Sequence, residues 1–228
     1  MAVMQREHLE LNGKIVNVFV QDPHAKTVFL LTFADAESCI YDLVKRCTDV
    51  PFNLIQLVVP DWDNSLSPWP HTAIFHGGNG YQGNAEQFIK EIVLDIYPQV
   101  KERFSLDPIS LAIGGYSLAG LCSLYAGFLT DCFDAILCVT GSLWFSRFPQ
   151  FVESHDLSPK IRYIDMSLGD KEPENYNLYM RNIGPNTTQI LNALENKGVD
   201  VCFVWVPGKH LFQTNERQAA AIARYLEK

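Results

Sequence analysis

The sequence of 228 residues predicts an α/β protein with a mostly parallel central sheet between layers of helices. Short apolar runs rich in β-branched residues alternate along the chain with longer segments of helical periodicity, as expected for such a sheet. The hydrophobic content of 47% and a mean hydropathy of -0.01 are typical of a soluble globular protein. Because the length suits one domain, we expect residues 1–228 to form a single domain.

The first half of the chain begins with two strand signals and one helix signal. Segments 15–20 and 27–31 are apolar, are separated by a proline-containing turn, and are expected to be strands that pair near one edge of the sheet. Segment 36–46 has apolar residues at three- and four-residue spacing, which predicts a helix with Asp35 as its N-cap. Segment 54–59 is largely apolar, as in a strand covered on both faces.

A long connection follows at residues 60–83, and it far exceeds the usual length of a loop between a strand and a helix. Its aromatic residues Trp62, Trp69, Phe75 and Tyr81 favour an ordered segment over a flexible linker, because a linker would not carry so much surface worth burying. We therefore expect the connection to fold over the edge at which the parallel strands end.

The rest of the chain continues the alternation of helix and strand. Phe88, Ile92, Ile96 and Val100 recur at every fourth position and predict an amphipathic helix over 84–104. The later elements expected from the same patterns are strands at 109–113, 133–140, 161–168 and 201–206, helices at 118–127 and 187–197, and a final helix that follows His210 and ends at about 225. Ligand sites of such sheets form at the carboxyl ends of the strands.

The segment LAIGGYSLAG at 111–120 is an apolar run that meets a glycine turn and continues as a helix. Small residues at Gly115 and Ala119 allow a strand to turn directly into a helix around Ser117, whose side chain is then forced outward. The following helix directs backbone N–H groups and the positive end of its dipole at that oxygen. A capping serine in an ordinary turn is the alternative, and the strand and helix on either side favour a nucleophile elbow.

Acid and base candidates follow Ser117 at two later strand ends, namely Asp170 or Glu172 and then His210. A histidine can remove the serine proton, and a carboxylate can hold the imidazole in the required tautomer. We favour Glu172 as the acid, because Asp170 lies nearer the strand and is suited to bracing the turn. His210 directly follows the last strand in the segment PGKH, and the other histidines are less well placed.

The chain resembles the esterase group of the α/β-hydrolase superfamily, which includes esterase D-like and enterochelin esterase-like enzymes. The resemblance covers nearly the whole chain and is carried by the segments GGYSLAG, SLGDKEPEN, PGKH, GSLWF and DWDNSLSPWP. The order of serine, acid and histidine is also that of this superfamily. The resemblance implies a three-layer fold and a serine esterase that cleaves a small carboxylic ester through an acyl-enzyme, without a cofactor. A thioesterase, an acyltransferase and a non-catalytic binding protein of the same fold are the alternatives.

The expected oxyanion hole consists of backbone N–H groups. One is that of Leu118, and the second is that of Phe33 or Ala34, after the strand that this fold uses for the purpose. This chain departs from the common pattern there, since Thr32 and Phe33 stand where many hydrolases have His-Gly. The segment His76-Gly77-Gly78 resembles another oxyanion motif, but it precedes the wrong helix, and we interpret it as a turn.

Three aromatic residues are expected to line the substrate pocket, namely Trp144, Trp62 and Tyr116, the last of which precedes the candidate nucleophile. For the tryptophans, core packing is the alternative, and it applies most strongly to Trp69 between two prolines. A wall as bulky as Trp144 predicts room for a short acyl chain, which favours acetyl to butyryl esters over lipids.

Charge and cysteine usage limit the partners and the compartment. The formal net charge of -8 disfavours nucleic acid and anionic membranes, so the expected partner is a small-molecule ester, with a homo-oligomer left open. The six cysteines lie mostly in apolar segments without a C-x-x-C pair, so we expect reduced core thiols and no metal site. The N-terminal residues carry no apolar segment for export, which predicts a cytoplasmic protein.

Overall fold

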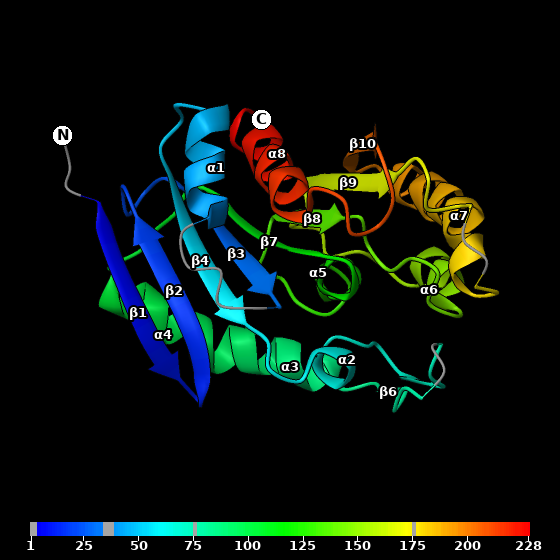
Figure 1. Ribbon diagram of the computed structural model, residues 1–228. Coiled ribbons are helices and arrows are strands. Elements are labelled where there is room, and N and C mark those ends of the chain that lie inside the picture. The colour runs from blue at the N-terminus through cyan, green and yellow to red at the C-terminus, as the bar shows by residue number, and fades with distance from the viewer. Residues whose placement is uncertain (1–3, 34–38, 75–76, 175–176) are drawn as a thin grey trace.

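A computed structural model describes residues 4–33, 39–74, 77–174 and 177–228. Eight strands form one sheet in the order β1-β2-β4-β3-β7-β8-β9-β10 (Figure 1). Their bounds are β1 Gln5–Leu11, β2 Lys14–Val20, β3 Lys26–Thr32, β4 Phe52–Val58, β7 Leu111–Tyr116, β8 Ala135–Val139, β9 Tyr163–Gly169 and β10 Asp200–Val206. Within this sheet β2 pairs antiparallel with β1 and β4, and every other pair is parallel. The predicted, mostly parallel sheet is confirmed.

Helices cover both faces of the sheet and make the expected three layers (Figure 1). On one face, α1 (Cys39–Cys47) and α8 (Thr214–Leu226) pack against each other and enclose the smaller core. The helices that enclose the larger core are α3 Ala85–Glu91, α4 Tyr97–Arg103, α5 Leu118–Ala126, α6 Phe148–Ser154 and α7 Ile183–Asn196. The α/β-hydrolase architecture predicted from the sequence is therefore present.

The amino-terminal edge of the sheet differs from the prediction. Residues 15–20 and 27–31 form strands, but they do not pair, because β4 lies between β2 and β3. On its other side β2 pairs with β1, a strand that was not predicted and whose exposed and half-buried residues alternate. Asn12 and Gly13, both with positive φ, make the two-residue turn between them. Asn-Gly is the preferred sequence of such a turn, so the hairpin did have a sequence signal.

Several helix bounds also differ from the prediction. The helix expected at 84–104 is interrupted by a π-helical turn, Ile92–Ile96, just before Pro98. Proline cannot donate the next helical hydrogen bond, which explains the wider turn at this point. Helix α6 was not predicted, and α7 begins four residues before the expected start at 187. The proposed N-cap Asp35 lies outside the described residues.

The connection at 60–83 contains a short helix, α2 (Trp62–Ser65), and a two-stranded ribbon of β5 (Pro70–His71) and β6 (Tyr81–Gln82). Trp69 anchors it, since its ring packs against Tyr125 and Phe148 and its indole N–H donates to the carbonyl of Ser146 at 3.1 Å. Trp69 therefore packs in the core, which was the alternative to a place in the pocket wall. Gly83 has a φ of 82°, and a Cβ there would come within 2.4 Å of the Trp69 backbone.

Two further features of the described residues concern membranes and thiols. In this part of the chain no helix has both the length and the hydropathy that crossing a membrane requires. The cysteines whose side chains are described are free thiols, and they are Cys47, Cys122, Cys132, Cys138 and Cys202.

Candidate active site

The candidate nucleophile lies where β7 ends and α5 begins, at the centre of the sheet. Ser117 has φ 61° and ψ -120°, a backbone conformation that is uncommon for any residue other than glycine. Hydrogen bonds on both sides hold it there, because its N–H donates to the carbonyl of Val139 at 3.1 Å and its carbonyl accepts from the Ser142 N–H at 3.0 Å. The strained turn predicted from the sequence is thus fixed by the neighbouring strand end.

Small residues around the elbow are a steric requirement. A Cβ on Gly115 would lie 2.5 Å from the Cβ of Ala119, so the strand and the helix could not approach as they do. Ala119 is fully buried in this contact. Alanine in place of the second glycine of the common motif is accommodated because the space beside it is left by Gly115.

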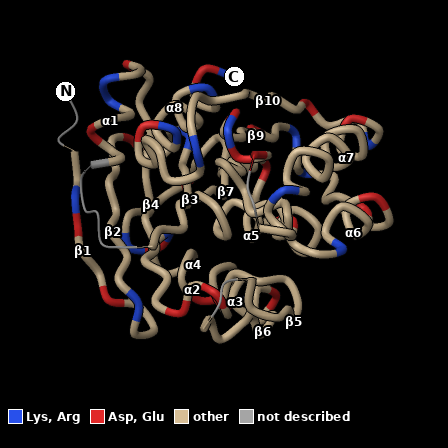
Figure 2. The backbone as a smooth tube through the Cα atoms, turned by 45° about the vertical axis from the view of Figure 1, so that its right-hand side comes forward, with Lys and Arg blue, Asp and Glu red and all other residues tan. Residues whose placement is uncertain are grey.

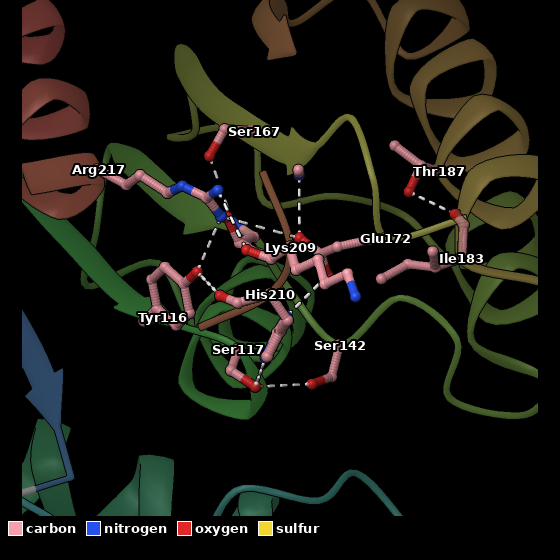
Figure 3. A network of polar contacts seen from close by, with 12 residues as sticks. Tyr116, Ser117, Ser142, Ser167, Glu172, Ile183, Thr187, Lys209, His210 and Arg217 are labelled. Atoms are coloured by element: carbon pink, nitrogen blue, oxygen red, sulfur yellow. Dashed lines mark hydrogen bonds and ion pairs between the residues drawn. The ribbon is translucent and has the colours of Figure 1, made fainter. Parts of the chain in front are cut away.

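Ser117, His210 and Glu172 form a continuous hydrogen-bonded chain (Figure 3). The Oγ of Ser117 is 2.8 Å from Nε2 of His210, and Nδ1 of His210 is 2.7 Å from Oε2 of Glu172. The second carboxylate oxygen of Glu172 accepts the backbone N–H of Gly169 at 2.9 Å. Glu172 is only 5% exposed, so its carboxylate is held by these partners and shielded from water.

Asp170 has a different position, although it was the competing candidate for the acid. Its carboxylate accepts the backbone N–H of Gly208 at 2.8 Å and is exposed. It therefore ties the loop that carries Glu172 to the loop that carries His210 without contacting the imidazole. This is the bracing role that its place next to the strand suggested.

Arg217 on α8 supports both loops from behind (Figure 3). Its Nη2 donates to the carbonyls of Pro207 at 2.6 Å and Lys209 at 3.2 Å, and its Nη1 lies 3.9 Å from Oε1 of Glu172. The side chain is buried, which makes these contacts the stronger for lack of competing water. No motif in the sequence points to this residue, because Arg217 lies on α8 whereas His210 lies in the loop before that helix.

Tyr116 lies beside the imidazole and links it to Arg217. Its hydroxyl donates to the backbone carbonyl of His210 and accepts from Nη1 of Arg217, the latter at 3.1 Å. Burial raises the pKa of the Tyr116 phenol, which keeps the donating proton in place. Tyr116 was expected to line the pocket, and it does so while also fixing the backbone of the histidine loop.

Ser142 is a second hydroxyl at the elbow that sequence reasoning did not single out for a role. Its Oγ lies 3.2 Å from Oγ of Ser117, and only 3% of the residue is exposed. It directly follows Gly141 at the end of β8, which is the position in the sequence from which it could have been found. A hydroxyl there can orient the Ser117 side chain toward His210.

The candidate oxyanion donors are described only in part. The N–H of Leu118 is the first of α5, so the helix offers it no acceptor, and its residue lines the cleft beside Ser117. Phe33 also lines the cleft and is 71% exposed, with its ring edge against Trp62. Ala34 and His76 lie outside the described residues.

The cleft in front of Ser117 has two lobes, and both are lined by Ser117, His210 and Trp62. The α8 lobe, of about 500 Å³, extends toward α8 between the ends of β3 and β7 and includes Ile40 and Gln218 in its wall. The α2 lobe, of about 400 Å³, extends toward α2 and the β5–β6 ribbon. Its wall includes Asp63, Ile74, Tyr81, Ser142, Trp144 and Met180.

The predicted pocket residues Trp144, Trp62 and Tyr116 all line this cleft, but its size differs from the expectation. Trp144 walls only the α2 lobe, and the α8 lobe opens on the other side of Ser117. Each lobe lies within the usual volume range of ligand pockets, about 300–1,000 Å³. The volume therefore does not support the restriction to short acyl chains that was inferred from Trp144 alone.

Within the described residues no group of three or more histidine, cysteine, aspartate or glutamate side chains is arranged to hold a metal ion. The groups that the described strand ends bring together are the Ser117 hydroxyl, the His210 imidazole and the Glu172 carboxylate.

A scan against protein-family models and a search of curated proteins gave no match. Solved structures do match. The siderophore hydrolase EstB from Aspergillus nidulans has a TM-score of 0.76 and 15% identity, with 99% of this chain and 95% of that chain covered. An IroE-like serine hydrolase from Shewanella oneidensis has a TM-score of 0.78 and 16% identity, with 99% and 80% covered.

A third similar structure is the enterobactin hydrolase IroE in complex with DFP, with a TM-score of 0.67 and 13% identity, covering 98% of this chain and 93% of that chain. At such identities the likeness concerns the fold. It confirms the resemblance drawn from the sequence motifs at that level, because the chain has the α/β-hydrolase fold that these hydrolases share.

Proposed function

We propose that the protein is a serine hydrolase that cleaves a carboxylic ester through an acyl-enzyme intermediate. The observation that carries this proposal is the unbroken hydrogen-bonded chain from Ser117 through His210 to the buried Glu172, with the serine on a strained elbow. Nucleophile, base and orienting acid at these distances are the combination that makes a serine hydroxyl nucleophilic at neutral pH.

In the proposed reaction His210 removes the Ser117 proton while Oγ attacks the ester carbonyl carbon. The carbonyl oxygen becomes an oxyanion near the N–H of Leu118, and Glu172 stabilises the imidazolium. The C–O bond to the alcohol then breaks, and the alcohol leaves with the proton from His210. Water attacks the acyl-enzyme by the same route, which releases the carboxylic acid and restores Ser117.

The names of the similar structures support an ester over other acyl compounds, since they describe siderophore and enterobactin hydrolases and a ferulic acid esterase. Thioester hydrolysis and acyl transfer to another alcohol use the same groups and stay as alternatives within this proposal. A non-catalytic binding protein is disfavoured by the intact chain of Ser117, His210 and Glu172.

The direct experiment compares hydrolysis of p-nitrophenyl butyrate by the wild-type protein and by Ser117→Ala. We expect kcat to fall by about 10⁶-fold, to the residual rate that binding and the oxyanion hole provide alone. Ser154→Ala, which removes an exposed hydroxyl on α6, is the matched control and should keep full activity. Equal turnover by Ser117→Ala and the wild type, with both folded, would refute the proposal.

A further inference from the structure

The α2 lobe combines aromatic walls with a single acidic side chain. Trp62, Tyr81 and Trp144 line it together with Asp63 and Ser117. The rings of Tyr81 and Trp144 are 6.0 Å apart between centroids, so they form adjoining walls. Aromatic faces next to a carboxylate are the surroundings that bind organic cations in proteins.

No lysine or arginine balances this carboxylate in the described cleft. The residues that line the two lobes include no lysine or arginine, and no ion pair of Asp63 with a basic residue is found in the described part of the chain. The sequence has no lysine or arginine from residue 47 to residue 89, a segment that includes α2 and the ribbon. Figure 2 shows the same absence of blue segments along α2, β5 and β6.

Asp63 also interacts with the wall of the lobe. Partial burial, followed by the nearby charge of Asp61, raises the pKa of the Asp63 carboxyl. Burial, followed by the charge of Asp63, raises the pKa of the Tyr81 phenol to about 12. Asp63 therefore lies near Tyr81, and its carboxylate is exposed at the rim of the α2 lobe, where an incoming cation can reach it.

The α8 lobe offers a contrast. Its described lining residues include no aspartate, glutamate, lysine or arginine, and apart from His210 they are apolar or neutral polar groups such as Ile40 and Gln218. The two lobes therefore favour different parts of one substrate. A neutral or apolar part fits the α8 lobe, and a positively charged part fits the α2 lobe.

We propose that the α2 lobe binds a cationic substituent, such as an alkylammonium group, of the ester that Ser117 attacks. This inference rests on the proposed esterase function and names its substrate class. Asp63 supplies the opposite charge and Trp62, Tyr81 and Trp144 supply aromatic faces. The net charge of -8 adds long-range attraction for cations and repels anionic esters.

Matched pairs of esters that differ only in charge test this inference. Choline butyrate and 3,3-dimethylbutyl butyrate have the same shape with the cation in the alcohol part. The p-nitrophenyl esters of 4-(trimethylammonio)butyrate and 5,5-dimethylhexanoate place the same difference in the acyl part. For at least one pair we expect kcat/KM to favour the cationic ester by about tenfold at pH 8 and low salt.

The preference should depend on Asp63. We expect Asp63→Asn to reduce the ratio of kcat/KM for the cationic ester over its neutral partner to about onefold, because only the cationic ester loses an opposite charge. Asp49→Asn is the matched control, because it removes one exposed carboxylate before the start of β4, at the opposite edge of the sheet from the cleft, and should keep the preference.

The outcomes separate this inference from the proposed function. If the neutral esters are cleaved in a Ser117-dependent manner and neither pair shows a preference, or the preference survives in Asp63→Asn, the cation site is refuted and the esterase stands. If none of the four esters is cleaved by the folded protein, the proposed function fails and the substrate class fails with it.

Discussion

The strand ends that carry Ser117, Glu172 and His210 and the connection at 60–83 meet at one cleft but are held in different ways. The strand ends are fixed by backbone hydrogen bonds and by close backbone packing that leaves no room for a side chain, as at Gly115. The connection has a tight backbone contact of its own at Gly83, but it is anchored to the rest of the molecule by the packing of Trp69 against Tyr125 of α5 and Phe148 of α6. The candidate chemistry thus depends on local backbone geometry, whereas the substrate wall depends on long-range packing.

The largest expected effect tests whether local geometry selects the acid. Glu172→Gln keeps the shape but cannot stabilise the imidazolium, so we expect kcat for p-nitrophenyl butyrate to fall by up to about 10⁴-fold. Asp170→Asn, which changes only the brace to Gly208, is the matched control and should cost far less. The reverse order would transfer the acid role to Asp170, and two small effects would indicate a serine–histidine dyad.

A smaller effect is expected where the support is indirect, at Arg217. Arg217→Met removes the bonds to the carbonyls of Pro207 and Lys209, and the resulting displacement of the histidine loop should lower kcat by about 10²-fold with little change in KM. Arg217→Met also removes a positive charge near Glu172, so the protonated imidazole of His210 is repelled less. The rise of activity with pH should therefore move to higher pH.

Arg217→Lys tests the role of that charge, since it keeps the charge but not the two-pronged contact. It should restore the original pH profile and only part of kcat. If Arg217→Met lowers the melting temperature while the pH profile and the kcat of the folded fraction stay unchanged, Arg217 has a structural role only.

The smallest expected effect lies in the substrate wall. Trp144→Leu enlarges the α2 lobe, so the ratio of kcat/KM for octanoyl over butyryl esters should rise, with each newly covered methylene worth about 0.8 kcal/mol, or about fourfold. Phe145→Leu is the matched control, because Phe145 is fully buried and packs behind Trp144 at a centroid distance of 5.5 Å. Equal ratios in both variants would remove Trp144 from the wall.

The difference between the two regions also explains what could be predicted from the sequence. The parallel sheet and the elbow follow from local patterns, since apolar runs predict strands and small residues around Ser117 predict a tight turn. The pairing of β2 with β1 was missed, although Asn12-Gly13 indicates the hairpin. The π-helical turn before Pro98 is a local consequence of proline that a periodicity argument does not include.

Residues that reach the site only through the tertiary fold were the hardest to predict. Arg217 approaches the histidine loop only because α8 packs across β8 and β9, and Ser142 approaches Ser117 only because β8 lies beside β7. Trp144 could be assigned to the cleft from its strand-end position, but the size of the cleft could not, because the α8 lobe is formed by elements from both ends of the chain.

The most direct test of the central claim is labelling of the intact protein with a fluorophosphonate, followed by mass spectrometry of its peptides. An activated serine reacts with this probe and an ordinary serine does not. We expect a single adduct on Ser117, and we expect it to be lost in His210→Ala although the hydroxyl is still present. An unlabelled Ser117 in folded wild-type protein, or equal labelling in His210→Ala, would contradict the account.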